Sequence, residues 1–426
     1  MYFTPELSHD HIPSLIRKFK TLVGWKNLNK RLLYLDQERK KPLLKTLIEK
    51  RYKLEITLHE IIKYQEATRR IPWEPTRNQI SVYSFIAMVA QVYERLSPFA
   101  KNKLQSRLKG DLKTKAGFGP TAFEMIIAAN LLQNNFEIEF KDLENTSDGG
   151  IYDIFARKNK KELEVECKYI TGDKGRKIHQ EEIHKLAEKL ETEINLHRKN
   201  DNRNLYVSIK IKDRLEKNEE YIRTLKENII KILKDPTKQI DSKEYIIEAT
   251  IFSDRISPFK KHVEEDKVRQ FVAKQFNVQQ PHAFVCYSPN HNAIVVNISS
   301  EKEDQVLNRI YESILKDCKN QFSKKEPAIL CCQLADVTEE QLKALQKAQK
   351  DEDIGLQIIA NLILQKRPFL LGIGFMTEGE GYKKTYPNLV GVPKLYSNSG
   401  SVFFFKNHDH PLAKDRDYDV YNFLKE

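Results

Sequence analysis

The segment 151–170 (IYDIFARKNKKELEVECKYI) constrains the fold more than any other part of the chain, because its pattern is typical of two short strands joined by a tight turn. We expect the polar turn at 157–161 and the second strand at 163–170. Side chains alternate between the two faces of a strand. One face of the second strand is therefore apolar, whereas the other carries Glu164, Glu166 and Lys168.

The charged side chains of this hairpin suit a magnesium site. Mg²⁺ prefers carboxylate oxygens, keeps several waters and completes its shell with substrate phosphate. Asp153 on the first strand and Glu166 on the second would be protein ligands, and Lys168 could orient or deprotonate water and stabilise charge on a phosphate. The alternative is a solvated hairpin with a cross-strand ion pair. Strands this apolar usually lie inside a sheet, where carboxylates are costly unless they bind something.

The segment upstream of the hairpin adds another acidic residue. Residues 121–134 have helical periodicity with Glu124 in the first turn, and 136–140 predict a strand. Glu124 has two interpretations, which can coexist. It could be a metal ligand, or it could complete a capping box with Thr121, three residues before it.

The order helix-Glu, strand, strand-Asp, strand-Glu-x-Lys resembles the PD-(D/E)XK nuclease superfamily, whose fold is restriction-endonuclease-like. The matching residues are Glu124, Asp153, Glu166 and Lys168, and the resemblance covers residues 117–212. It implies an α/β core sheet flanked by helices. It also implies a catalytic set of these four residues, with Mg²⁺ bound by the three carboxylates and Mn²⁺ able to substitute.

The loop that follows the hairpin is rich in cations. Lys174, Arg176 and Lys177 lie among glycines that allow the backbone to approach a ligand closely. Because the loop comes directly after the Glu-x-Lys strand, we expect these residues, with Gln180, to contact substrate phosphates. The alternative is an ordinary surface loop.

The positive charge of the chain is confined to its first part. Residues 1–120 hold 24 Lys and Arg against 11 Asp and Glu, a net +13, whereas the remaining residues hold 48 against 49, a net −1. This asymmetry is typical of a surface that binds a polyanion, although solvated basic helices would give the same count.

Periodicity predicts a basic, all-helical domain over 1–115 and a nuclease-like domain over 116–426, which ends in a C-terminal α/β extension. In the later part we expect a helix at 179–198 and a strand at 205–211. Further helices and strands are predicted at 221–233, 245–252, 283–287, 293–298, 306–319, 326–334, 339–348, 368–375 and 402–405.

The five cysteines show no zinc-ligand spacing, and no apolar run is long enough to span a bilayer. We therefore expect reduced thiols in a cytoplasmic protein without a signal peptide or a membrane partner. The resemblance implies an endonuclease acting on double-stranded DNA, in a setting such as restriction or anti-phage defence, as a homodimer or with a protein partner. The alternative is a non-catalytic nucleic-acid-binding or scaffold protein built on a nuclease fold.

Overall fold

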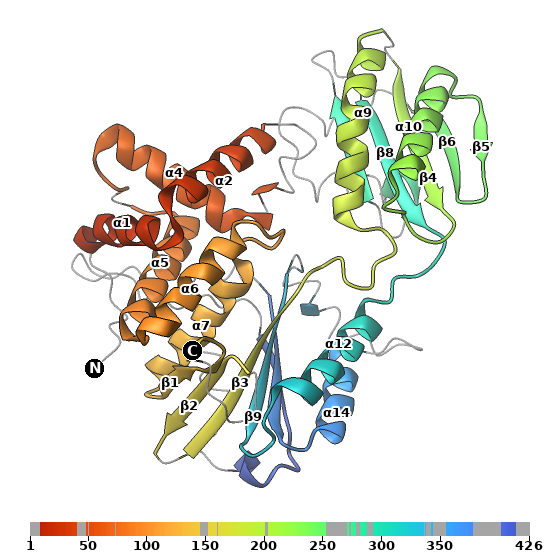
Figure 1. Cartoon of the computed structure of the whole chain (residues 1–426). Helices are drawn as coiled ribbons and strands as arrows, with labels where there is room; N and C mark the ends of the chain where they lie inside the picture. Colours follow the sequence, from red (N-terminus) through yellow and green to blue (C-terminus); the bar gives the residue numbers. More distant parts are fainter. Residues whose placement is uncertain are drawn as a thin grey trace. The chain divides into compact units, whose positions relative to one another are not determined.

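The computed structural model describes most of the chain as two compact units (Figure 1). The first unit comprises Met1–Asp36, Glu49–Lys174 and Leu307–Glu426, and the second comprises Gln37–Ile48 and Gly175–Val306. Each unit contains one mixed β-sheet with helices, so the chain has the expected mixed α/β class. The described residues are 9–40, 48–49, 51–72, 74–144, 152–159, 161–200, 203–252, 271, 274–277, 282–287, 293–335, 337, 342–343, 355–377 and 402–414.

The N-terminal part of the first unit is helical, as predicted. Its helices are α1 (Ile12–Val23), α2 (Trp25–Glu38), α4 (Lys53–Thr68), α5 (Arg77–Arg95) and α6 (Pro98–Asp111). Two of them begin with capping side chains: Thr76 and Gln79 form a capping box at α5, and the Ser97 hydroxyl accepts the Ala100 N–H at α6.

These helices do not form a unit of their own, so the structure divides the chain differently from the expected boundary at 115/116. Phe19 of α1 and Phe85 of α5 pack with Phe118, which precedes α7 (Gly119–Gln133), with ring centroids 5.5–5.6 Å apart. One apolar core continues from α1 to the strands of the first sheet. Deleting residues 1–115 would therefore expose this shared core.

The first sheet has the order β1-β2-β3-β9-β10-β11. Its central pairs, β3–β9 and β9–β10, are parallel, and the others are antiparallel. In Figure 1, α7 lies on one side of this sheet and α12 (Val306–Gln321) and α14 (Leu356–Lys366) lie on the other. The strands are β1 (Glu137–Phe140), β2 (Ile154–Lys158), β3 (Lys161–Ile170), β9 (Ala328–Leu334), β10 (Leu370–Met376) and β11 (Val402–Lys406).

The strand predicted at 205–211 does not join this sheet, which corrects the expected continuous core over 117–212. It forms β4 (Asn204–Ile211) of the second sheet, and β9 takes the position parallel to β3. Both strands are apolar and buried, so their composition suits either place. Which strands pair is decided by contacts between residues far apart in the sequence.

The second unit contains the sheet β5-β6-β4-β8-β7, in which β4 and β8 are parallel. Helices α9 (Gln180–Asn200) and α10 (Glu219–Lys234) share an apolar core with this sheet and cover one of its faces (Figure 1). The other strands are β5 (Gln239–Asp241), β6 (Tyr245–Phe252), β7 (His282–Tyr287) and β8 (Ala293–Ser300).

The predicted helices and strands of the C-terminal half are found within a few residues of their expected ends, apart from the helix at 339–348, most of which lies outside the described residues. Among the helices that the structure describes, none combines the length and the apolar character that a membrane span requires.

Candidate metal centre

Asp153 lies against the strand that carries Glu166. The register of the antiparallel β2–β3 pair places Ile154 opposite Val165. The next residues beyond this pair are Asp153, which directly precedes β2, and Glu166 on β3. The Oδ2 atom of Asp153 accepts a hydrogen bond of 2.7 Å from the backbone N–H of Cys167. This hydrogen bond fixes the Asp153 carboxylate beside the Glu-x-Lys segment.

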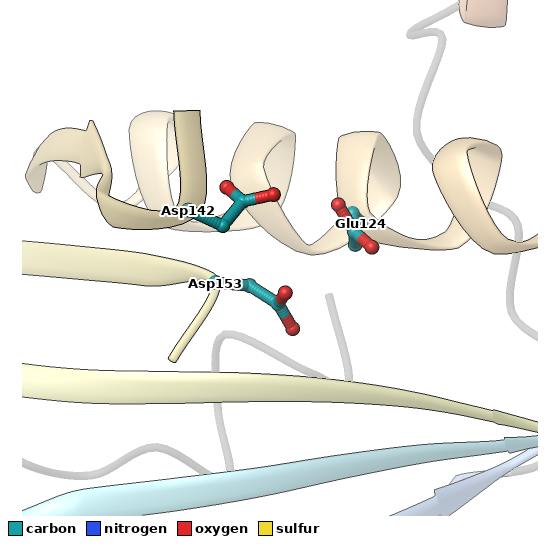
Figure 2. Close-up of side chains that lie close together, drawn as sticks. All are labelled: Glu124, Asp142 and Asp153. Carbon is teal, nitrogen blue, oxygen red and sulfur yellow. The ribbon is translucent and has the colours of Figure 1, made fainter. Parts of the chain in front are cut away.

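Two further carboxylates converge on Asp153. Oxygens of Glu124, Asp142 and Asp153 lie within 4.8 Å of one another, and Figure 2 shows the three side chains close together. Glu124 comes from α7, and Asp142 from the short helix α8 (Lys141–Glu144) that directly follows β1. Two oxygens on opposite sides of a Mg²⁺ ion are about 4.2 Å apart. A small inward rotation would therefore bring these oxygens to bonding distance from one ion.

One arginine connects two of these carboxylates. Arg107 of α6 donates from Nη1 to Oδ2 of Asp142 at 2.8 Å and from Nη2 to Oε1 of Glu124. The second oxygens, Oε2 of Glu124 and Oδ1 of Asp142, are buried and have no hydrogen-bond partner within the described part of the chain. Arg107 therefore binds one of the two oxygens of each carboxylate.

Glu166 and Lys168 lie on β3 next to Asp153, outside the group of three carboxylates. The Lys168 ammonium lies 2.8 Å from Glu166 Oε1 and 3.7 Å from Oδ2 of Asp317 on α12. Glu166 is only 2 % exposed, and its Oε2 atom also lacks a partner among the residues that the structure describes.

The donor set fits a divalent cation. Glu124, Asp142 and Glu166 each retain one unpartnered buried oxygen, which is costly unless something binds there. With Asp153 and the cations of Arg107 and Lys168, the fully ionised cluster has a net charge of −2. A hard oxygen-seeking ion such as Mg²⁺ would neutralise that charge and satisfy those oxygens.

The electrostatics of the centre are those of crowded, buried acids. Burial raises the pKa of Asp153 to about 6, against the opposing hydrogen bond from Cys167. Burial, followed by repulsion from Asp153, raises the pKa of Glu166 to about 8 and that of Glu124 well above its ordinary value. Burial opposes the charge of Lys168, but its pairing with Glu166 prevails, so the pKa of Lys168 is raised. Such perturbed groups cluster at functional sites.

The capping-box interpretation of Glu124 is wrong. Helix α7 begins at Gly119, before the expected start, and its N-cap residue Phe118 makes no side-chain cap hydrogen bond. The hydroxyl of Thr121 instead donates to Asp111 Oδ2 at 2.6 Å, and Glu124 pairs with Arg107.

The solvated-hairpin alternative is wrong for the part of β3 that carries Glu166, which is buried on both faces. The cross-strand ion pair is present at the exposed end of the hairpin, between Arg157 and Glu162. Glu164 and Glu166 have different surroundings although both are buried on this strand. Glu164 accepts hydrogen bonds from the backbone N–H (2.9 Å) and the hydroxyl of Ser323, just beyond α12, so its role is structural.

Of the predicted phosphate contacts, Lys174 belongs to the unit that holds the carboxylates. Its ammonium donates to the hydroxyl of Ser313. That hydroxyl donates to Asp317, one helical turn further along α12, and Asp317 pairs with Lys168. Burial lowers the pKa of Lys174, and the nearby Lys168 charge acts in the same direction.

The other three predicted contacts, Arg176, Lys177 and Gln180, belong to the second unit. The Lys177 ammonium is paired with Asp213 at 2.9 Å, and its backbone N–H donates to Asp304 at 2.8 Å.

Asp142 and Arg107 are two residues of the cluster that were not expected from the sequence. A signal for Asp142 exists: Phe140, the last residue of β1, pairs with Ile154, so an acid just after β1 emerges beside Asp153. Arg107 lies 17 residues before Glu124 on another helix, and nothing in the local pattern indicates their contact.

Comparisons of the chain with family models, with curated proteins and with solved structures give no significant match. The function of the centre is therefore inferred from its own geometry and chemistry.

Proposed function

We propose that this chain is a Mg²⁺-dependent nuclease and that the carboxylate cluster around Asp153 is its catalytic centre. The observation that carries the proposal is the convergence of Glu124, Asp142 and Asp153, with Glu166 and Lys168 beside Asp153 on the neighbouring strand. Glu124, Asp142 and Glu166 each keep one buried oxygen without a partner in the described part of the chain. Glu124 lies on α7, Asp153 directly before β2, and Glu166 and Lys168 on β3. This order supports the resemblance to the PD-(D/E)XK superfamily and its restriction-endonuclease-like core.

Each residue has a distinct role in the proposed reaction. Glu124, Asp142, Asp153 and Glu166 would hold the ion through their carboxylate oxygens. A bound Mg²⁺ would polarise the scissile phosphodiester and lower the pKa of a coordinated water, and Mn²⁺ would be an acceptable substitute. The Lys168 ammonium, held by Glu166 and Asp317, would orient the attacking water and stabilise the charge that develops on the phosphate.

The substrate that we propose is double-stranded DNA, cleaved endonucleolytically. The basic helices of the first 120 residues, with their net charge of +13, share a core with the strands of the centre and would attract a polyanion. Among the four expected phosphate contacts, Lys174 is the strongest candidate, because it is linked through Ser313 and Asp317 to Lys168. A role in restriction or anti-phage defence is supported by the resemblance alone.

The test is incubation of supercoiled plasmid with the full chain in Mg²⁺, Mn²⁺ or EDTA. We expect nicked and linear products with either metal and none with EDTA. Asp153→Asn should abolish cleavage, since the amide oxygen can still accept the Cys167 N–H but the charge is gone. Asp241→Asn, the same change at an exposed residue of β5, should cleave like the wild type. Cleavage that resists EDTA, or that survives in Asp153→Asn, would refute the proposal.

A non-catalytic nucleic-acid-binding protein is the second candidate. One observation favours it: Arg107 and Lys168 already neutralise part of the acidic cluster, as in a structural ion-pair network. This alternative predicts DNA binding with a steep salt dependence and no cleavage in any divalent metal.

A further inference from the structure

Arg107 is not one of the residues that match the nuclease superfamily, yet it contacts two of the four carboxylates. Its side chain is 25 % exposed and reaches from α6 to Glu124 on α7 and to Asp142 on α8. A guanidinium is planar, and its N–H groups form a rigid fork, so two such contacts fix the relative orientation of both acceptors.

The fork uses one oxygen of each carboxylate and leaves the other. The free atoms, Oε2 of Glu124 and Oδ1 of Asp142, are both buried and, within the described residues, unpartnered. Both side chains belong to the group whose oxygens lie within 4.8 Å of Asp153. Helix α6 also holds the backbone of α8, because the Lys103 ammonium donates to the carbonyl oxygen of Asp142 at 3.2 Å.

We infer that Arg107 is a positioning residue of the metal centre: its guanidinium holds one oxygen of Glu124 and one of Asp142, so that the other oxygen of each stays available for a divalent cation. This inference rests on the proposed function, since it requires that the cluster binds metal. Arg107 acts through the two carboxylates rather than on the substrate.

The charge and the shape of Arg107 have opposite effects on metal affinity. Its positive charge repels a cation, so a purely electrostatic role predicts tighter metal binding when the charge is removed. Its fork preorganises the ligands, and the loss of such supporting contacts typically weakens metal binding by about 10–100-fold. Arg107→Lys separates the two effects, because it keeps the charge and removes the fork.

The experiment is calorimetric titration of Mn²⁺ into the full chain, comparing the wild type with Arg107→Lys and Arg107→Ala. We expect both variants to bind Mn²⁺ about 10–100-fold more weakly than the wild type. Arg157→Lys is the matched control: Arg157 pairs with Glu162 at 2.9 Å on the exposed end of the hairpin, and its variant should bind normally. Wild-type affinity in Arg107→Lys would overturn the inference, and tighter binding in Arg107→Ala would show that Arg107 acts only through its charge.

A double-mutant cycle covers the case in which Arg107→Ala does not fold. Asp142→Ala removes one acceptor of the fork, so Arg107→Lys should weaken Mn²⁺ binding less in that background than in the wild type. Equal effects in both backgrounds would contradict a role through Asp142. If the wild type binds no Mn²⁺, the proposed function and this inference fail together. If Asp153→Asn abolishes binding while Arg107→Lys is normal, only this inference fails.

Discussion

The two sheets of this chain have similar central strands but differ in the charged side chains that they bury. Each is built around a buried parallel strand pair, β3–β9 in the first unit and β4–β8 in the second. Among the strand residues of the second sheet whose burial is described, the polar ones that are buried are the neutral Asn204 and Asn297. The first sheet buries Glu164 and Glu166 and has Asp153 at the end of an adjacent strand.

This difference indicates which charges have a role beyond folding. The second sheet shows that such a strand pair needs no buried carboxylate for its stability, and burying one is costly. Glu164 offsets that cost with hydrogen bonds from Ser323. Glu166 retains an unpartnered oxygen within the described residues, and burial, followed by repulsion from Asp153, raises its pKa, as expected of the metal ligand that we propose.

The largest expected effect separates these two glutamates of β3. Glu166→Gln should lower plasmid cleavage by more than about 10⁴-fold, because a metal ligand and the partner of Lys168 are lost together. Its melting temperature without metal should hold or rise, since repulsion with Asp153 is relieved. Glu164→Gln should be less stable than the wild type yet still cleave. The same rates in both variants would contradict the distinction.

Lys168 comes next. Lys168→Ala should slow cleavage by about two to four decades, the effect typical of losing one acid–base or electrostatic group. Its Mn²⁺ affinity should be unchanged or higher, because a nearby positive charge is removed. Lys168→Arg should not restore the rate, since a planar guanidinium differs in shape from the ammonium that Glu166 and Asp317 hold. Lys189→Ala, in the second unit, is the control. Full activity in Lys168→Ala would make the Glu-x-Lys spacing a coincidence.

Replacing one buried isoleucine in each sheet by alanine tests whether cleavage depends on the packing of the first sheet alone. Ile329 of β9 and Ile209 of β4 are both fully buried, and replacing either by alanine should cost about 2–5 kcal/mol of unfolding free energy. Ile329 pairs with Val165 on β3, so Ile329→Ala should also lower cleavage, by up to about 10²-fold. Ile209→Ala should leave cleavage by the folded fraction unchanged. An equal loss of cleavage would show that the second sheet participates.

The smallest effect concerns Glu55 of α4, a buried acid of the first unit outside the cluster. It accepts the Phe118 N–H at 3.0 Å, and burial raises its pKa to about 7. Between pH 4.5 and 7 the folded state therefore keeps a proton that the unfolded state releases, and the unfolding free energy falls as pH rises.

Glu55→Gln removes this decrease of the unfolding free energy with pH, because glutamine does not titrate. Its stability relative to the wild type should grow with pH, by up to about 3 kcal/mol at pH 8, without any change in metal binding. Urea unfolding of both proteins at pH 5 and pH 8 measures the difference. If the two proteins differ in unfolding free energy by the same amount at pH 5 and at pH 8, Glu55 does not have the raised pKa.

How much the sequence could predict depended on the distance over which each contact is made. Strand alternation was enough to place Asp153, Glu166 and Lys168 on one hairpin, because hairpin pairing is local. The position of β4 in a second sheet was not predictable, since its apolar pattern suits either sheet. Arg107 was missed for a related reason, since it reaches the centre from another helix through tertiary packing. Asp142 was within reach of prediction, because the pairing of Phe140 with Ile154 places it beside Asp153.

The central claim is that the acidic cluster of the first sheet binds a divalent cation. It is tested most directly by titrating Mn²⁺ into the full chain and following the electron paramagnetic resonance signal of free Mn²⁺. We predict saturable binding to the wild type, the same binding to Asp241→Asn, and loss of that binding in Asp153→Asn. Undiminished binding to Asp153→Asn, or no binding to the wild type, would contradict the claim.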